Sequence, residues 1–213
     1  MSRSDMLDAL CFNLYINTFH VTGISTFVAW FLRRHLGVAY REFYDGLYQR
    51  LMQDAWFANE MAEARSYYEK WTRDGAIQHP NIGRSVEISG LNLHYRAAIN
   101  IYMNAGKLRP HVFGILQDYV QDNYAVDQHM LQQLFRLQQL FFVDFDAIPQ
   151  YPQTVEFDYD FVNYLIADRP LKNSVQYQFE YRGTHSHDLD FFCEMIYYGR
   201  RRDRKSTRLN SSH

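Results

Sequence analysis

A long uncharged stretch near the start of the sequence sets the first limit on the fold. No Asp, Glu, Lys or Arg occurs between Ala9 and Leu32, which is long enough for a helix to cross a bilayer. Polar residues interrupt the stretch, and so many in one lone helix would be too costly at the middle of a membrane. The interrupting residues are Asn13, Asn17, His20, Thr22, Gly23, Ser25 and Thr26. We therefore expect no membrane span, but two buried core helices that meet near Gly23.

Helical periodicity recurs through the first two thirds of the sequence. The clearest apolar stripe lies between Tyr40 and Asp54, where charged and polar residues fill the opposite face. Its members are Phe43, Tyr44, Leu47, Tyr48, Leu51 and Met52. Further helices are expected over residues 5–20, 23–37, 60–74 and 92–104, and then after Pro110 and after Asp127. Together these segments predict a bundle of helices with apolar inner faces.

Local signals mark where these helices begin and end. Ser4 is a suitable N-cap for the first helix, and Asp127 for the helix that follows it. Gly75 is a fitting stop for the helix over 60–74. The residues of that helix expected to face inward are Met61, Ala64, Tyr68 and Trp71.

The pattern of apolar and polar residues changes after Pro149 and Pro152. Two segments alternate aromatic or aliphatic residues with polar ones, a period of two that indicates half-buried strands. Their apolar members are Val155, Phe157 and Tyr159 in the first segment, and Val175, Tyr177, Phe179 and Tyr181 in the second. One or two helical turns are expected between them, and Asp188 is placed to cap a last helix.

The expected fold class is therefore mainly α (α+β). We expect a multi-helix bundle of about six to eight helices, with a small two- or three-stranded β element in the C-terminal third. The expected domains are a helical domain over 1–148 and a small α/β extension over 149–202 that packs on it.

The C-terminal segment from Asp203 to His213 reads differently from the rest. It resembles the in-frame translation of a sequencing-library adapter, which also occurs as a tail on metagenomic open reading frames. It holds one large apolar residue, Leu209, and no periodicity, so we expect an artefactual, disordered tail. The alternative is an ordinary polar C-terminus. On the first interpretation the natural sequence continues past Arg202.

Composition excludes several functional classes. The formal net charge of −2 is a poor match for nucleic-acid binding, which needs a clustered basic face. Cys11 and Cys193 lie far apart without a CxxC pair, which excludes a cysteine-based zinc or iron–sulfur site within this piece. Two free thiols in a reducing cytosol are expected, with one disulfide as the alternative. Asp5 and Asp8 stand where a signal peptide needs basic residues, so a cytoplasmic location is expected.

Two sets of polar residues are candidates for binding. Asn13, Asn17 and His20 form a polar stripe on the first helix, which is interpreted as a ligand-facing wall or as an internally satisfied helix face. The other set lies where a turn joins a helix and would face an anion or a partner domain, or simply cap the helix. Its members are Asn92, His94 and Arg96.

The sequence assigns neither a catalytic residue nor a metal ligand. No GxGxxG, Walker-type, GxSxG or HExxH motif occurs. His185, His187 and Asp188 have a spacing that binds metals on a strand, but they stand among loop residues and are better interpreted as a solvated loop.

Several short motifs together are similar to one family. They are Met1–Asp5 before an aromatic-rich helix, Phe19–His20 with Gly23, Tyr40-x-x-Phe43-Tyr44, Asn92-Leu93-x-x-Arg96, and Tyr197–Arg202. This combination resembles the region C-terminal to the catalytic core in cobalamin-binding-domain radical SAM proteins. The resemblance covers most of residues 1–202, and its motifs are soft.

The resemblance implies a larger parent protein. In that family a Rossmann-like cobalamin domain comes first, then a partial barrel whose CxxxCxxC motif holds a [4Fe–4S] cluster with S-adenosylmethionine, and then a variable helical region. This sequence contains neither motif, so no catalytic residue is carried over and no cofactor is expected in this piece. On this interpretation Met1 is an internal methionine, and the partners are the missing N-terminal catalytic domains of the same chain.

Three functions are therefore open. The first is a non-catalytic C-terminal accessory domain of a radical SAM enzyme, which shapes substrate access or braces the catalytic core. The second is a free-standing helical module that binds a protein or a small ligand. The third is an enzyme in its own right that uses the wall formed by Asn13, Asn17 and His20.

Overall fold

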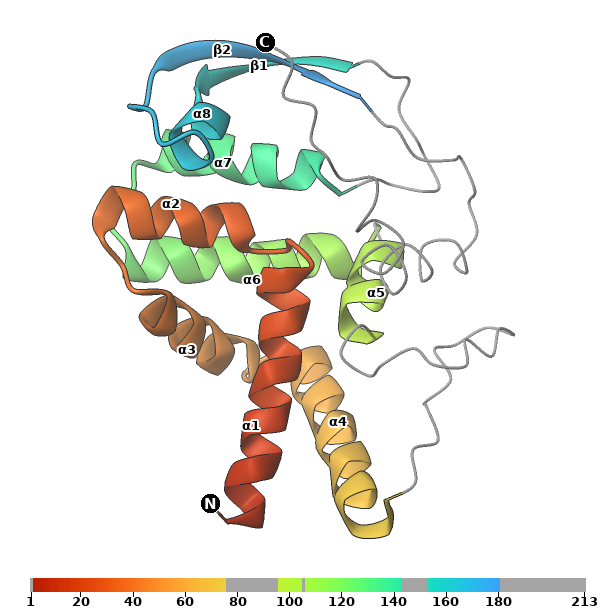
Figure 1. Ribbon diagram of the computed structural model, residues 1–213. Coiled ribbons are helices and arrows are strands. Elements are labelled where there is room, and N and C mark those ends of the chain that lie inside the picture. Colours follow the sequence, from red (N-terminus) through yellow and green to blue (C-terminus); the bar gives the residue numbers. More distant parts are fainter. Residues whose placement is uncertain (1, 76–95, 105, 143–152, 181–213) are drawn as a thin grey trace, which may run out of the picture.

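The computed structural model describes residues 2–75, 96–104, 106–142 and 153–180 (Figure 1). Within these ranges the chain forms eight α-helices, one π-helix and two strands, which confirms the expected mainly α fold with a small β element. The helices are α1 (Arg3–Ile16), the π-helix η1 (Asn17–Val21), α2 (Thr26–Leu36), α3 (Tyr40–Leu51), α4 (Ala55–Asp74), α5 (Arg96–Met103), α6 (Leu108–Asn123), α7 (Gln128–Leu140) and α8 (Phe161–Leu165). The strands are β1 (Gln153–Tyr159) and β2 (Asn173–Phe179).

The helices stack in tiers between the N-terminus and the sheet. Figure 1 shows α1 and α4 side by side at the end that holds the N-terminus, with α2 and α6 crossing beyond them. The sheet lies at the opposite end, over α7 and α8. Contacts between α3 and α6 and between α2 and α7 join the tiers. One cluster of buried side chains runs from α1 to β1 and α8.

The first helix begins earlier than expected. Ser2, not Ser4, is its N-cap: the Ser2 hydroxyl accepts a hydrogen bond from the Asp5 backbone N–H, and the Asp5 carboxylate accepts one from the Ser2 backbone at 2.8 Å. This reciprocal capping box satisfies two backbone donors at once, which a cap at Ser4 would not do.

The uncharged stretch forms two helical segments that meet at Gly23, as expected. After α1 the chain widens into η1, and Gly23 then takes a φ of 94°, which favours glycine. The Thr18 hydroxyl donates to the Leu14 carbonyl at 3.0 Å and Thr22 bonds to the Thr18 carbonyl in the same way. Such side-chain bonds to the preceding turn perturb regular helix geometry. Within the described ranges, no helix is both long and apolar enough to cross a membrane.

The apolar stripes are buried except for Tyr48, which is half-buried on α3, and for two residues at helix ends. Phe43, Tyr44, Leu47 and Leu51 are buried on α3, and Met61, Ala64 and Tyr68 are buried on α4. Met52 is 37% exposed because α3 ends at Leu51 and Met52 is the C-cap. Trp71 is 38% exposed because its end of α4 meets the polar first turn of α1, where Arg3 donates to the Glu69 carbonyl.

The two strands pair antiparallel in the expected region. Val155 lies opposite Tyr177, and Phe157 lies opposite Val175. Val155 and Phe157 are buried on the face that contacts α7. Between the strands, the Asp160 carboxylate caps α8 by accepting from the Asn163 backbone N–H at 3.2 Å. The division at residue 148 stays a prediction.

Candidate functional site

A chain of hydrogen bonds runs from His20 into the core. Nδ1 of His20 lies 2.7 Å from the Tyr44 hydroxyl, which lies 3.2 Å from the Ser25 hydroxyl. Ser25 in turn donates to the Phe19 carbonyl at 3.1 Å. Because each hydroxyl has one hydrogen, all three contacts are hydrogen bonds only if His20 donates to Tyr44 and Tyr44 donates to Ser25. The chain thus assigns the hydrogen of neutral His20 to Nδ1.

Burial alters the acid–base behaviour of the groups in this hydrogen-bond chain. It lowers the pKa of His20 below its usual value and raises the pKa of Tyr44 well above its own, because burial disfavours the charged form of each group. Both groups are therefore neutral at pH 7.

The buried Tyr15 hydroxyl donates to the Tyr44 carbonyl at 3.0 Å, which holds this turn of α3 against α1.

The structure joins two residues of the proposed polar wall, Asn13 and Asn17, and gives the third, His20, a different partner. Asn13 is exposed, and its carbonyl accepts a hydrogen bond of 2.8 Å from the side chain of Asn17, the first residue of η1. His20 alone bonds to a side chain of another helix, through Tyr44. Of the second set, Asn92 and His94 lie outside the described residues. Arg96 begins α5, and its side chain is likewise not described. His185, His187, Asp188, Cys193 and residues 203–213 also lie outside the described ranges.

Sequence reasoning missed Gln138, a buried amide on α7. Its Oε1 accepts from the Phe27 backbone N–H at 2.9 Å, and its Nε2 donates to the Gly23 carbonyl at 2.6 Å. It therefore caps the start of α2 from a different helix. The signal was present, because Gln138 follows Leu131 and Leu134 at the spacing of the buried stripe.

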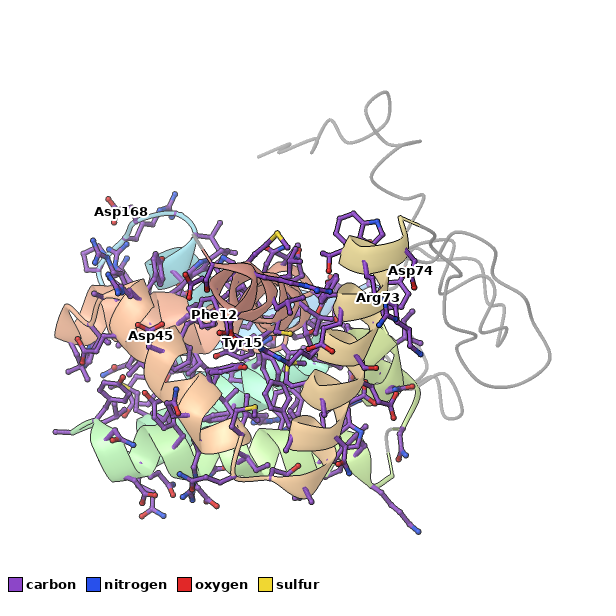
Figure 2. The ribbon with its side chains drawn as sticks, turned by 90° about the horizontal axis from the view of Figure 1, so that it is seen from below. Phe12, Tyr15, Asp45, Arg73, Asp74 and Asp168 are labelled. Atoms are coloured by element: carbon purple, nitrogen blue, oxygen red, sulfur yellow. The ribbon has the colours of Figure 1, made fainter. Side chains whose placement is uncertain are left out.

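An open groove of about 680 Å³ lies between α1 and α3. Its lining residues are Asp8, Ala9 and Phe12 from α1, and Asp45, Gly46, Tyr48 and Gln49 from α3. Phe12 and Asp45 lie next to each other in the view of Figure 2. The Phe12 and Tyr48 rings meet edge to face, with centroids 5.5 Å apart and planes at 69°. The groove thus combines two aromatic rings with two carboxylates.

The two carboxylates already have arginine partners. Asp8 pairs with Arg65, which also lies 3.7 Å from Glu69, and Asp45 accepts from Arg41 at 3.3 Å. Exposed ion pairs of this kind contribute little stability, so a ligand can replace them at small cost. Burial, followed by the effect of nearby acidic groups, raises the pKa of Tyr48, whose ring is therefore neutral at physiological pH.

Comparisons with known proteins give no assignment for this chain. No protein-family model matches its sequence, and no curated protein matches it. The similarity to the helical region of radical SAM proteins therefore depends on the sequence motifs alone. Within the described part of the chain, no group of three His, Cys, Asp or Glu side chains is arranged to hold a metal ion.

Proposed function

We propose that this chain is a non-catalytic helical domain that acts by binding, and that the groove between α1 and α3 is its binding site. The observation that carries the proposal is the groove itself, whose volume lies within the range of about 300–1,000 Å³ that is usual for ligand sites. Its aromatic rings offer apolar contact, and its few polar groups offer orientation, which is the usual composition of such sites.

The polar wall on α1 and η1 supports binding less well. The Asn17 side chain bonds to the Asn13 carbonyl one turn earlier, and His20 belongs to a chain of hydrogen bonds that ends at a backbone carbonyl in the core. These bonds give the polar residues structural roles. The wall is therefore a weaker candidate than the groove for a catalytic or ligand-binding site.

The motif resemblance supplies a specific setting for this function, the C-terminal accessory domain of a radical SAM enzyme. In that setting the groove would face the catalytic domains of the same chain, and the cofactor chemistry would belong to those domains. Coding DNA on the 5′ side of the Met1 codon tests the setting. An open frame that encodes CxxxCxxC supports it, and a ribosome-binding site preceded by a stop codon favours the free-standing module instead.

The binding function has a test of its own. Backbone amide spectra of the ¹⁵N-labelled protein are recorded with a library of cationic, anionic and neutral aromatic compounds. The expected result is that at least one compound shifts the amides of Ala9, Phe12, Gly46 and Tyr48 together. If no compound moves these four amides, the groove is not a binding site.

A further inference from the structure

We propose that the groove between α1 and α3 takes the arginine side chain of a partner protein segment. This inference depends on the proposed binding function and names the chemistry of the partner. It is carried by the arrangement of rings and carboxylates in the groove, and by an arginine that the protein holds in a similar way elsewhere.

Each helix presents one carboxylate and one ring to the groove. Asp8 and Phe12 are four residues apart on α1, and Asp45 and Tyr48 are three apart on α3. The two members of each pair therefore lie on the same face of their own helix. A cation over either ring is attracted by the negative face of the π system. A carboxylate one turn away accepts hydrogen bonds from the same cation.

The carboxylates of the groove select a guanidinium group. Both already bind one, from Arg65 and from Arg41. A planar guanidinium stacks on a ring and donates in a fork to a carboxylate, whereas the ammonium of lysine is a compact point charge. Arginine therefore uses the rings and the acids of this groove together.

Another part of the same chain holds an arginine with this combination of groups. The Arg34 guanidinium lies 4.3 Å from the centroid of the Tyr164 ring and pairs with the Asp168 carboxylate. It also donates to the Arg169 carbonyl at 3.1 Å. A ring, a carboxylate and a backbone carbonyl together hold the Arg34 guanidinium, and the groove has two rings and two carboxylates, both of the latter paired with arginines of the chain.

The size of the groove indicates a segment rather than a free amino acid. Ala9 is a small residue, and it lets a peptide backbone approach α1. The Gln49 amide both donates and accepts hydrogen bonds, as a bound peptide backbone requires. A volume of about 680 Å³ leaves space for the residues on either side of the arginine.

The test uses the whole chain and three blocked tripeptides. Acetyl-Gly-Arg-Gly-amide is titrated into ¹⁵N-labelled protein, beside peptides in which lysine or uncharged citrulline replaces arginine. The arginine peptide is expected to shift the Ala9, Phe12, Gly46 and Tyr48 amides. The citrulline peptide is expected to bind roughly tenfold more weakly, because it lacks the charge that strengthens the bonds to the carboxylates.

Variants separate the two parts of the site. Asp45→Asn and Tyr48→Leu are each expected to weaken the arginine peptide roughly fivefold to tenfold. Asp118→Asn, which removes an exposed carboxylate from α6, is the matched control and should leave the affinity unchanged. Circular dichroism confirms that each variant is folded, and two independent groove variants keep the test decisive if one is not.

Five results would overturn the proposal. Equal binding of the citrulline and arginine peptides removes the role of charge, and equal binding of the lysine peptide removes the preference for guanidinium. Shifts confined to amides outside the groove place the peptide elsewhere. The amides of the groove are also compared between the native protein and the variant R200Q/R201Q/R202Q, with no peptide added. If they differ, the occupant of the groove is this chain's own basic segment. Where neutral or anionic compounds bind the groove and the arginine peptide does not, this inference fails while the binding function stands.

Discussion

Nδ1 of His20 lies 2.7 Å from the hydroxyl oxygen of Tyr44 and so links η1 to α3. Replacing Tyr44 with Phe keeps the ring but removes the hydroxyl that joins His20 to Ser25. Two partly or fully buried polar groups then lose a partner, so we expect a loss of about 1–3 kcal/mol in the free energy of unfolding. Urea titration measures it. Tyr40→Phe, on the exposed first turn of the same helix, is the control. Equal effects of the two variants would contradict the hydrogen-bond chain.

The burial of His20 predicts a dependence of stability on pH. Its folded-state pKa is lowered from the usual 6.5 because burial disfavours the charged ring. The unfolded chain therefore binds the proton first, so stability is complete above about pH 6.5 and falls as the pH drops towards the folded-state value. The free energy of unfolding of the native protein is compared with that of His20→Gln. We expect the difference between them to shrink as the pH falls from about 7.5 to about 5. A difference independent of pH would show that His20 titrates as in the unfolded chain.

A methyl group at Gly46 would overlap the Tyr119 hydroxyl, because α3 and α6 pack closely there. Gly46→Ala is therefore expected to destabilise the protein by about 1–3 kcal/mol in thermal or urea unfolding. Gly114→Ala on α6 meets no atom within 4 Å, and it should instead stabilise by about 0.5–1 kcal/mol through helix propensity. Tyr119→Phe removes the overlapping oxygen, so it should restore part of the loss in the double variant.

Gln138→Leu keeps an apolar contact at its position but leaves the Gly23 carbonyl and the Phe27 N–H without the amide that bonds them. We expect a cost of about 1–3 kcal/mol for each group that finds no other partner. Gln139→Leu, an exposed change one residue along, is the control. Hydrogen exchange at the first turn of α2 reports the same loss locally. Unchanged exchange there would mean that Gln138 does not cap α2.

The sequence predicted the parts of the fold that depend on periodicity and local caps. Asp127 caps α7 as expected, because its carboxylate needs only the Met130 N–H three residues away. The predicted burial of Met52 and Trp71 was wrong. Exposure at a helix end depends on which neighbouring segment covers it, and the periodicity of the sequence does not encode that neighbour. The element boundaries near α4 failed for a similar local reason, since Asp54 begins that helix earlier than expected.

The candidate site could be predicted only in part. The sequence indicates His20 as a candidate, but it places the partner, Tyr44, in the apolar stripe. A tyrosine has both an apolar ring and a polar hydroxyl, and a periodic pattern does not distinguish which of the two matters. The groove was missed because it depends on how α1 and α3 lie side by side. Neither Asp8 with Phe12 nor Asp45 with Tyr48 is unusual on its own helix, and only their tertiary apposition makes a site.

The bonds from Gln138 to the start of α2 also bear on how the chain folds during synthesis. Gly23 and Phe27 leave the ribosome long before Gln138 is translated, so α2 begins without its final cap. Such long-range closure is slow, because the entropy of bringing distant segments together is lost before the contact forms. An N-terminal nascent chain that stops before α7 is therefore expected to have a frayed α2, and this turn of the molecule should mature last.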